Sequence, residues 1–240
     1  MTIDVVFTKH EVPLDLREQN VVVFDILLAT STIVTLMEEG VQEIYPAVSE
    51  QEALEKHQAL PNSQLIGEKD GRPIEPYFAL PLPTVLIQSH LPAQVVMLTT
   101  NGTLAIRKSE GAKRVLIGSL LNNRAIVKAF LQEENWTLVC AGSHDQLAIE
   151  DVYGAGQWIA EYLKRRPTTR LTERAEVAFA TYNQKSAQRE ERLRQSMTGR
   201  MLIKQGYEGD IAYVAKQHAM HVIPYYERGI IRRTIDEEGI

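Results

Sequence analysis

The clearest pattern in the chain is a short run of β-branched and aromatic residues, Val21 to Phe24, which is too brief for a helix and is typical of a buried strand. The segment Thr30 to Met37 has helical periodicity, and Gly40 follows it as a stop signal. The same order of strand, polar loop and helix recurs at Val95–Thr100 with Thr103–Ser109, and at Thr137–Cys140 with Glu150–Arg166. This repeated order predicts strand–loop–helix units of an α/β protein.

Further elements extend this pattern. Ser49, with Glu52 three residues later, predicts a capped helix over 49–58. Several prolines and Gly71 make regular structure unexpected over 69–83. We also expect strands at 44–48, 64–67, 115–119 and 221–226, helices at 122–134 and 211–216, and one or two charged helices over 172–200. The fold class that follows is α/β, a layered α/β/α arrangement with a largely parallel or mixed sheet, in a single domain over 1–240. The length also allows two lobes, although no linker marks a boundary between them.

Composition narrows the function classes. Hydrophobic residues make up 44% and charged residues 24% of the chain, and the net charge of −5 gives no electrostatic reason to bind nucleic acid. The first residues lack a secretory pattern, and no apolar run approaches the ~18 residues of a membrane span. Cys140 is the only cysteine, so an internal disulfide is excluded. We therefore expect a cytoplasmic protein, with no membrane partner; the oligomeric state stays open, a homo-oligomer included.

Reactive side chains follow three of the predicted strands. In a parallel α/β sheet the carboxyl ends of strands open onto a common crevice, so we expect these exits to meet. The candidate oxygen ligands or bases are Asp25, Glu68, Glu150 and Asp151. Capping of a following helix is the alternative role for Asp25, and a helix N-terminal dipole also favours the last two acids.

A possible anion cradle spans Thr100, Asn101, Gly102 and Thr103, because the glycine allows close backbone approach and a helix follows. The same four residues also suit an ordinary turn and helix cap. Cys140 is expected to be a buried packing residue rather than a nucleophile, since no C-x₅-R phosphatase loop surrounds it. His144 is expected in a solvent-facing loop, and Asp210 suits either a helix cap or a site.

Several ordered motifs carry a family resemblance. Asp25 to Thr32, DILLATST, resembles D-V-L-R-A-[ST]-[ST]-T; Thr100 to Thr103 matches T-N-G-T; and Cys140 to Gly142, followed by Glu150 and Asp151, resembles C-A-G…L-E-D. These are motifs of the 2-phosphosulfolactate phosphatases. Further matches, in the same order, are Gly67-Glu68, Gly118-Ser119 with Asn122, Gly199-Arg200, and Gly206 with Asp210-Ile211.

The resemblance implies a Mg²⁺-dependent phosphatase that hydrolyses (2R)-2-phospho-3-sulfolactate, a step of coenzyme M biosynthesis in methanogens. Its partner is then a small anionic phosphorylated metabolite. The implied metal ligands are Asp25, Glu68 and Asp151, with Glu150 as a further catalytic acid. The implied substrate-binding residues are Thr100, Asn101, Gly102, Thr103, Ser119, Asn122, Gly142 and Arg200.

The chain departs from the family pattern at three places. Leu28 and Lys69 stand where the motifs have arginine, and the family's G-F-D-L-G-N-S-P appears here as Tyr77 to Pro83, with Ala79 in place of the aspartate. Arginine's bidentate contact with anions is poorly replaced by leucine. We therefore expect a shifted substrate preference. The alternative is a catalytically silent homologue that binds small anions or serves assembly; a nucleotide-binding enzyme is disfavoured because neither G-x-G-x-x-G nor G-x-x-x-x-G-K-[ST] occurs.

Overall fold

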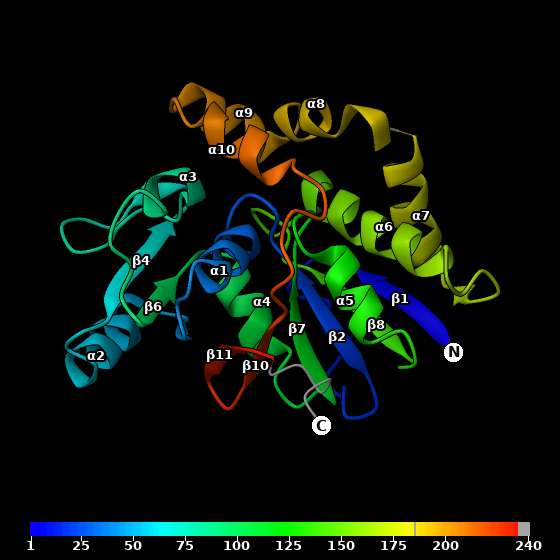
Figure 1. Cartoon of the computed structure of the whole chain (residues 1–240), viewed down its shortest axis with the longest axis horizontal. Coiled ribbons are helices and arrows are strands. Elements are labelled where there is room, and N and C mark those ends of the chain that lie inside the picture. Colours follow the sequence, from blue (N-terminus) through cyan, green and yellow to red (C-terminus); the bar gives the residue numbers. More distant parts are fainter. Residues whose placement is uncertain (185, 235–240) are drawn as a thin grey trace.

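The computed structural model describes residues 1–184 and 186–234. In this part of the chain, eleven strands form one mixed sheet in the order β5-β4-β6-β3-β11-β10-β7-β2-β8-β1-β9 (Figure 1). The strands are β1 (Thr2–Val6), β2 (Asn20–Phe24), β3 (Glu43–Ala47), β4 (Gln64–Lys69), β5 (Arg72–Pro73), β6 (Gln94–Leu98), β7 (Arg114–Gly118), β8 (Trp136–Cys140), β9 (Arg170–Leu171), β10 (Pro224–Glu227) and β11 (Ile230–Arg233).

Helices cover both faces of this sheet. They are α1 (Ala29–Glu38), α2 (Glu50–Ala59), α3 (Pro83–Leu86), α4 (Gly102–Lys108), α5 (Asn123–Ala129), α6 (Ile149–Leu163), α7 (Glu173–Asn183), α8 (Arg189–Arg194), α9 (Met197–Lys204) and α10 (Glu208–Val214). The layered α/β/α class with a mixed sheet is therefore confirmed.

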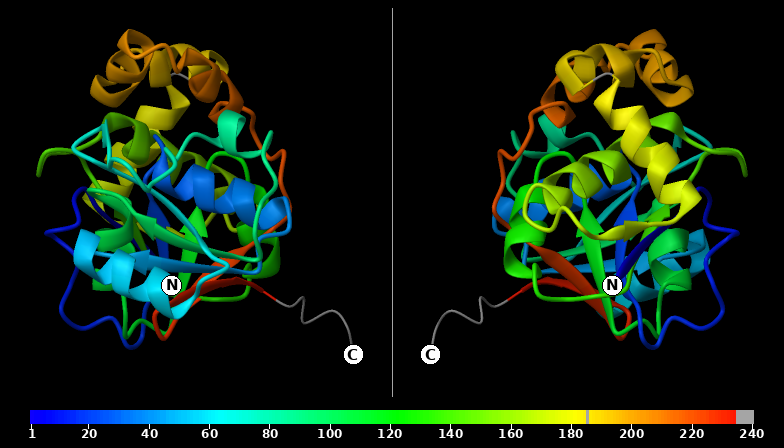
Figure 2. Two further views of the ribbon diagram at one scale, coloured as in Figure 1. Left: turned by 90° about the vertical axis from the view of Figure 1, so that its left-hand side faces the viewer. Right: turned by 90° about the vertical axis from the view of Figure 1, so that its right-hand side faces the viewer.

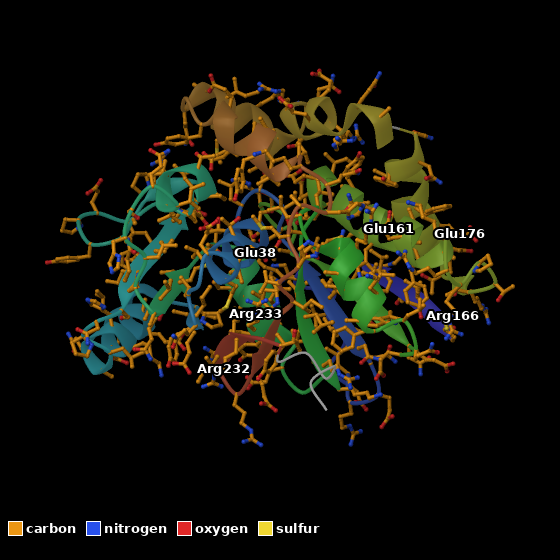
Figure 3. All side chains as sticks on the ribbon, viewed as in Figure 1. Glu38, Glu161, Arg166, Glu176, Arg232 and Arg233 are labelled. Carbon is orange, nitrogen blue, oxygen red and sulfur yellow. The ribbon has the colours of Figure 1, made fainter. Side chains whose placement is uncertain are left out.

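The sheet consists of two parallel blocks joined by a hairpin. β4, β6 and β3 are parallel to one another, and so are β7, β2, β8, β1 and β9. The antiparallel β10–β11 hairpin lies between the blocks, with β10 beside β7 and β11 beside β3. Arg232 of β11 (Figure 3) donates to Glu43 of β3 at 2.7 Å, which adds an ion pair to this junction.

Strand β2 shows why the sheet is buried on both sides. Val22 and Phe24 pack into a core with α5, α6 and α7, whereas Val21 and Val23 pack into another with α1 and α4. Successive strand side chains point to opposite faces, so a continuous apolar run indicates helices above and below. In the β3–β6–β4 block, α2 contributes Ala53 to a third, smaller core.

Most predicted elements agree with the structure, including the Ser49 cap, whose hydroxyl accepts from the Glu52 N–H. The N-terminal strand β1, the two-residue strands β5 and β9 and the second hairpin strand β11 lie in segments for which the pattern predicted no strand; β5 falls within 69–83, where regular structure was unexpected. The prediction of one or two helices over 172–200 was wrong: α7, a 3₁₀ turn, α8 and α9 follow one another there. The predicted 122–134 helix ends at Ala129.

Helices α8, α9 and α10 lie together at one end of the molecule, over the end of the sheet where α3 lies (Figures 1 and 2). Asp210 fixes this group to the body, because its carboxylate accepts from the Thr84 N–H and hydroxyl of α3, each at 2.9 Å. Among the described residues, no helix has both the length and the apolar character that a membrane crossing requires.

Candidate active site

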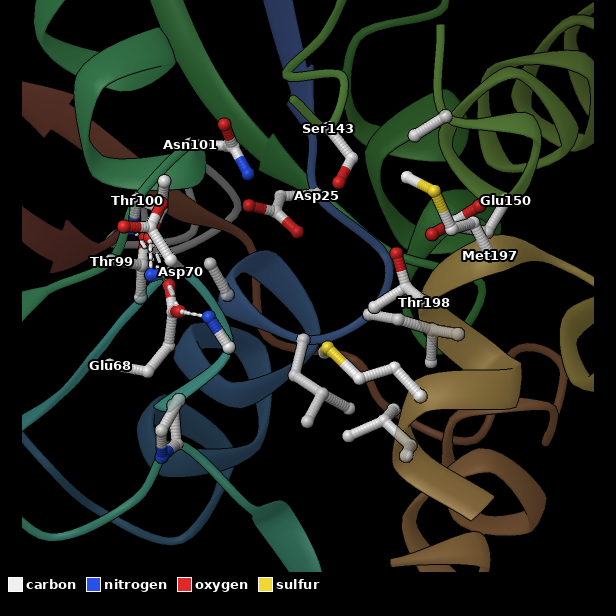
Figure 4. A pocket seen from close by; sticks show the side chains of 18 of the residues that line it. Asp25, Glu68, Asp70, Thr99, Thr100, Asn101, Ser143, Glu150, Met197 and Thr198 are labelled. Atoms are coloured by element: carbon white, nitrogen blue, oxygen red, sulfur yellow. Dashed lines mark hydrogen bonds between the residues drawn. The ribbon is translucent and has the colours of Figure 1, made fainter. Parts of the chain in front are cut away.

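A pocket of about 750 Å³ lies between the carboxyl ends of the strands and α9 (Figure 4). Residues that follow or end β1, β2, β4, β6 and β8 line it, together with the first turn of α6. The polar and charged lining residues are Lys9, Asp25, Glu68, Asp70, Thr99, Thr100, Asn101, Ser143, His144, Asp145, Glu150, Asp151, Thr198 and Gln205. The prediction that distant strand exits meet in one crevice is confirmed.

Asp25 is the carboxylate at the exit of β2, and only 9% of the residue is exposed. Burial raises its pKa to about 7, and the charges of Glu68 and Glu150 add to the rise, while backbone hydrogen bonds from Ala29 and Gly102 oppose it. A Cβ at Gly102 would lie 2.6 Å from Asp25 Oδ2. A glycine is needed there because the chain after β6 approaches this carboxylate directly.

Asp151, on the first turn of α6, holds two loops together. Its Oδ1 accepts from the Ile26 N–H at 2.8 Å and its Oδ2 from the Gly142 N–H at 3.1 Å. Burial, followed by the charges of Asp25 and Glu150, raises the pKa of Asp151 well above its ordinary value. The residue thus fixes the loops after β2 and β8 in position.

Glu68 organises the other side of the pocket. Its carboxylate accepts from the N–H groups of Thr100, at 2.7 Å, and Gly71, at 2.6 Å. The Thr100 hydroxyl in turn accepts from the Asp70 N–H at 2.7 Å (Figure 4). These bonds join the end of β4 to the TNGT loop, so Glu68 shapes the predicted anion cradle.

Glu150 faces α9 rather than the sheet (Figure 4). It is buried, and this burial raises its pKa, although a hydrogen bond from Thr198 and the charge of Arg192 oppose the rise. A carboxyl group with a raised pKa can hold a proton nearer to neutral pH than an exposed glutamate can.

Lys9 is the site residue that the sequence reasoning missed. Only 6% of its side chain is exposed, and its Nζ donates to Asn101 Oδ1 at 3.0 Å and Asp145 Oδ1 at 2.9 Å. Asp145 is hydrogen-bonded to Lys9 and also to His10, and these two contacts, that with Lys9 first, lower the pKa of Asp145 to about 2. A lysine soon after a Val-rich run, as in β1, was the signal that could have identified it.

Four of the predicted substrate contacts have structural partners instead. Asn122 accepts from the Ser119 N–H and donates to two backbone carbonyls, and the Ser119 hydroxyl pairs with Ser31. Thr103 donates to the Thr99 carbonyl. Arg200 is exposed on α9 and donates to the Gln195 carbonyl. None of these four lines the pocket in the described part of the chain, and neither does Gly102, whose N–H donates to Asp25; Thr100, Asn101 and Gly142 do line it.

Other residues with open roles are also placed. Cys140 is fully buried, and burial raises the pKa of its thiol well above the ordinary value, which disfavours a thiolate nucleophile. His144 is exposed at the pocket rim. Of the departures from the family motifs, Leu28 lines the pocket, but Ala79 does not: its backbone pairs with β4 at Leu65 and Gly67.

The carboxylates fit a magnesium ion in a limited way. In the residues that the structure describes, no group of three or more His, Cys, Asp or Glu side chains forms a metal cage, so Asp25, Glu68 and Asp151 do not make a ready three-ligand site. Magnesium commonly binds through one or two carboxylates and completes its shell with water and substrate phosphate. All three carboxylates accept backbone N–H groups. Asp25 suits this role best, because Figure 4 shows it between Glu68 and Glu150, and the charges of both these residues act on it. The mutual rise in pKa also marks a cluster of negative charge that a cation would relieve.

Comparison with known proteins identifies the family. The sequence model of the family described as 2-phosphosulpholactate phosphatase matches residues 6–229. The chain belongs to this family. Proteins similar to this chain in three bacteria are each named "Probable 2-phosphosulfolactate phosphatase". The Deinococcus radiodurans protein is 34% identical over 207 residues, 84% of this chain and 85% of the relative. The Symbiobacterium thermophilum protein is 32% identical over 87% of this chain and 91% of the relative. The Clostridium tetani protein is 27% identical over 97% of this chain and 100% of the relative.

Proposed function

We propose that this protein is a Mg²⁺-dependent phosphatase that hydrolyses 2-phospho-3-sulfolactate, or a related small phosphate monoester, to the hydroxy acid and phosphate. The observation that carries the proposal is the position of the buried Asp25, with a pKa of about 7, in the same pocket as the buried cation of Lys9. The names of the family relatives support the same reaction.

Lys9 and the TNGT loop supply the phosphate contacts. A lysine ammonium has three N–H donors, and the bonds to Asn101 and Asp145 use two of them. The third is left for a phosphoryl oxygen. Because Asn101 and Asp145 anchor the amine from two different loops, the charge is positioned before the substrate arrives, which is how enzymes stabilise developing charge.

The carboxylates divide the remaining work. Asp25 would hold the magnesium ion, which when bound supplies charge stabilisation for the phosphoryl oxygens and a more acidic water. Glu150 holds a proton in the buried carboxyl group and delivers it to the leaving ester oxygen as the bond from that oxygen to phosphorus breaks and a water oxygen bonds to phosphorus. The water releases one proton to solvent, and Glu150 takes up a proton again before the next turnover. Glu68 and Asp151 are positioning residues, since each fixes backbone N–H groups around the site.

The test is phosphate release by the purified chain from phosphorylated hydroxy acids, with EDTA and then with added Mg²⁺. We expect EDTA to abolish turnover and Mg²⁺ to restore it. Glu150→Gln should lower kcat and remove the fall of kcat at alkaline pH that comes from loss of the Glu150 proton, while Asp25→Asn should remove the response to Mg²⁺. Full turnover in metal-free buffer would overturn the metal dependence, and binding without any hydrolysis would favour the silent homologue.

A further inference from the structure

The pocket has two chemically different walls. The polar wall carries Asp25, Asn101, Glu68 and Lys9 at the strand ends. The opposite wall is mainly aliphatic and comes from the turn after β2, the loop before α3, and α9. Its aliphatic lining residues are Leu27, Leu28, Leu80, Pro81, Leu82, Met197, Met201 and Leu202, and its polar members are Thr198 and Gln205. Figure 4 shows Asp25 and Asn101 on one side of the space and Met197, from α9, on the other.

The aliphatic wall is a fixed part of the fold. Leu28, Leu82 and Leu202 are 9%, 4% and 4% exposed, and all three belong to the core that α5, α6 and α7 share with β2. Packed core side chains of this kind have little freedom to rearrange. Met197 and Met201 are the adaptable members, because an unbranched thioether fits irregular shapes.

Charges in the lining are strongly unbalanced. Among the described residues that line the pocket, Lys9 is the only lysine or arginine, whereas six carboxylates line it: Asp25, Glu68, Asp70, Asp145, Glu150 and Asp151. Lys9 is already paired with Asp145, and Arg192 lies beyond the lining, where its charge acts on Glu150. One phosphate can be neutralised here by Lys9 and a metal ion. A second or third anionic group on the substrate would find no further lysine or arginine in the described lining, only neutral donors such as Thr198 and Gln205 beside the carboxylates, and neutral donors offset the burial of a charge less well than a cation does.

We infer that the substrate is a monoester whose phosphate is its only strongly anionic group and whose organic part is aliphatic and packs against Leu28, Leu82 and Met201. This assignment rests on the proposed phosphatase function and narrows it to the related small monoesters, in place of 2-phospho-3-sulfolactate. A pocket of about 750 Å³ is large enough for such a body, since small-molecule sites span about 300–1,000 Å³. Polar and apolar parts of the ligand would each meet a matching wall.

The first experiment compares kcat/KM, with Mg²⁺ present, for ethyl, butyl and hexyl phosphate, and for 2-phospholactate against 2-phospho-3-sulfolactate. We expect kcat/KM to rise about threefold to fourfold per methylene while the aliphatic wall is being covered. We expect the added sulfonate to lower it at least about tenfold, the effect of one poorly matched charged group. Binding of the matching alkylphosphonates, measured by calorimetry, should follow the same order without any turnover.

The second experiment adds a cation to each side of α9. Met201→Arg places the cation in the aliphatic wall. It should raise the ratio of kcat/KM for 2-phospho-3-sulfolactate to kcat/KM for butyl phosphate at least about tenfold. Ile203→Arg adds the same charge on the same helix at a 39% exposed residue outside the lining, and should leave the ratio unchanged. Circular dichroism and thermal unfolding check that both variants fold.

The outcomes of these experiments distinguish the substrate assignment from the proposed phosphatase function. The highest kcat/KM for 2-phospho-3-sulfolactate in the unmodified chain would overturn the aliphatic assignment and leave the phosphatase intact. An equal change of the ratio in both arginine variants would show that net charge, not the wall, governs selection. Absence of phosphate release from every ester would overturn the proposed function, and this assignment with it.

Discussion

Replacement of Asp25 by asparagine tests the electrostatics of the site through stability as well as activity. The carboxyl group is buried, and its pKa is raised from 3.8 to about 7 by burial and by neighbouring Glu68 and Glu150. Asparagine has nearly the same volume and removes the charge. A buried carboxylate destabilises the folded state more than a neutral side chain does, so we expect Asp25→Asn to stabilise the fold at alkaline pH. We also expect this variant to be inactive, because it loses the carboxylate that would hold Mg²⁺.

The sign and size of the effect follow from linkage. Between pH 3.8 and about 7 the folded state keeps a proton at Asp25 that the unfolded chain has released, so stability falls as pH rises and the loss is complete above pH 7. The rise in pKa from 3.8 to about 7 corresponds to about 4 kcal/mol. The asparagine amide leaves one of the two backbone donors, Ala29 or Gly102, without an acceptor, at about 1–3 kcal/mol. The variant should therefore be more stable than wild type by about 1–3 kcal/mol at pH 8, and less stable at pH 4.

Urea unfolding in EDTA from pH 4 to pH 8 measures this difference directly. Added Mg²⁺ at pH 8 should stabilise the wild type and have no effect on the variant, since it acts through the Asp25 carboxylate. Asp15→Asn is the matched control: this exposed carboxylate has a pKa lowered by its hydrogen bonds with Arg17, so its loss cannot raise stability at pH 8. A difference in unfolding free energy between wild type and Asp25→Asn that stays constant from pH 4 to pH 8 would refute the reasoning.

Three further predictions test other parts of the structure. Lys9→Met should lower kcat/KM about tenfold to over a hundredfold by removing a charge-assisted contact to phosphate; steady-state kinetics showing a change below threefold would contradict that role. Cys140→Ser should keep most activity and lose ~1 kcal/mol or more in urea unfolding, because a hydroxyl replaces a thiol in an apolar strand; a trapped phosphocysteine in the wild type would show the opposite. Gly156→Ala should lower Tm by about 4–8 °C in thermal scans, since its Cβ would lie 2.1 Å from the Ala178 carbonyl oxygen of α7. Gly209→Ala, with no atom within 4 Å of the new Cβ, is its control and should cause no loss.

The sequence was sufficient for the sheet class and for several of the residues that line the pocket. Asp25 and Asn101 were found because short apolar runs identify buried strands, and parallel strands share one functional edge. Glu150 and Asp151 were found for the same reason. Their separate roles were not readable, because they depend on which backbone N–H groups and which helix each carboxylate faces.

The missed features all depend on contacts between distant segments. Lys9 gains its role only when β1 pairs with β8, which brings it to Asn101 and Asp145. Arg200 matched a motif, but successive helical residues are about 100° apart, and in α9 the pocket side belongs to Met201 instead. Hairpin strand β11 was hidden in a charged tail, since Arg232 and Arg233 reduce its apolar signal.

The central position of the β10–β11 hairpin has a consequence for synthesis on the ribosome. Its residues, 224–233, are the last described strands to leave the exit tunnel, yet they join the two parallel blocks of the sheet. Until they emerge, β3 and β7 present open strand edges that can pair with other chains. A truncated or stalled product would therefore be prone to aggregate, although it already carries Lys9, Asp25 and Glu150. A quality-control protease would act on a chain whose two parallel blocks are not yet joined.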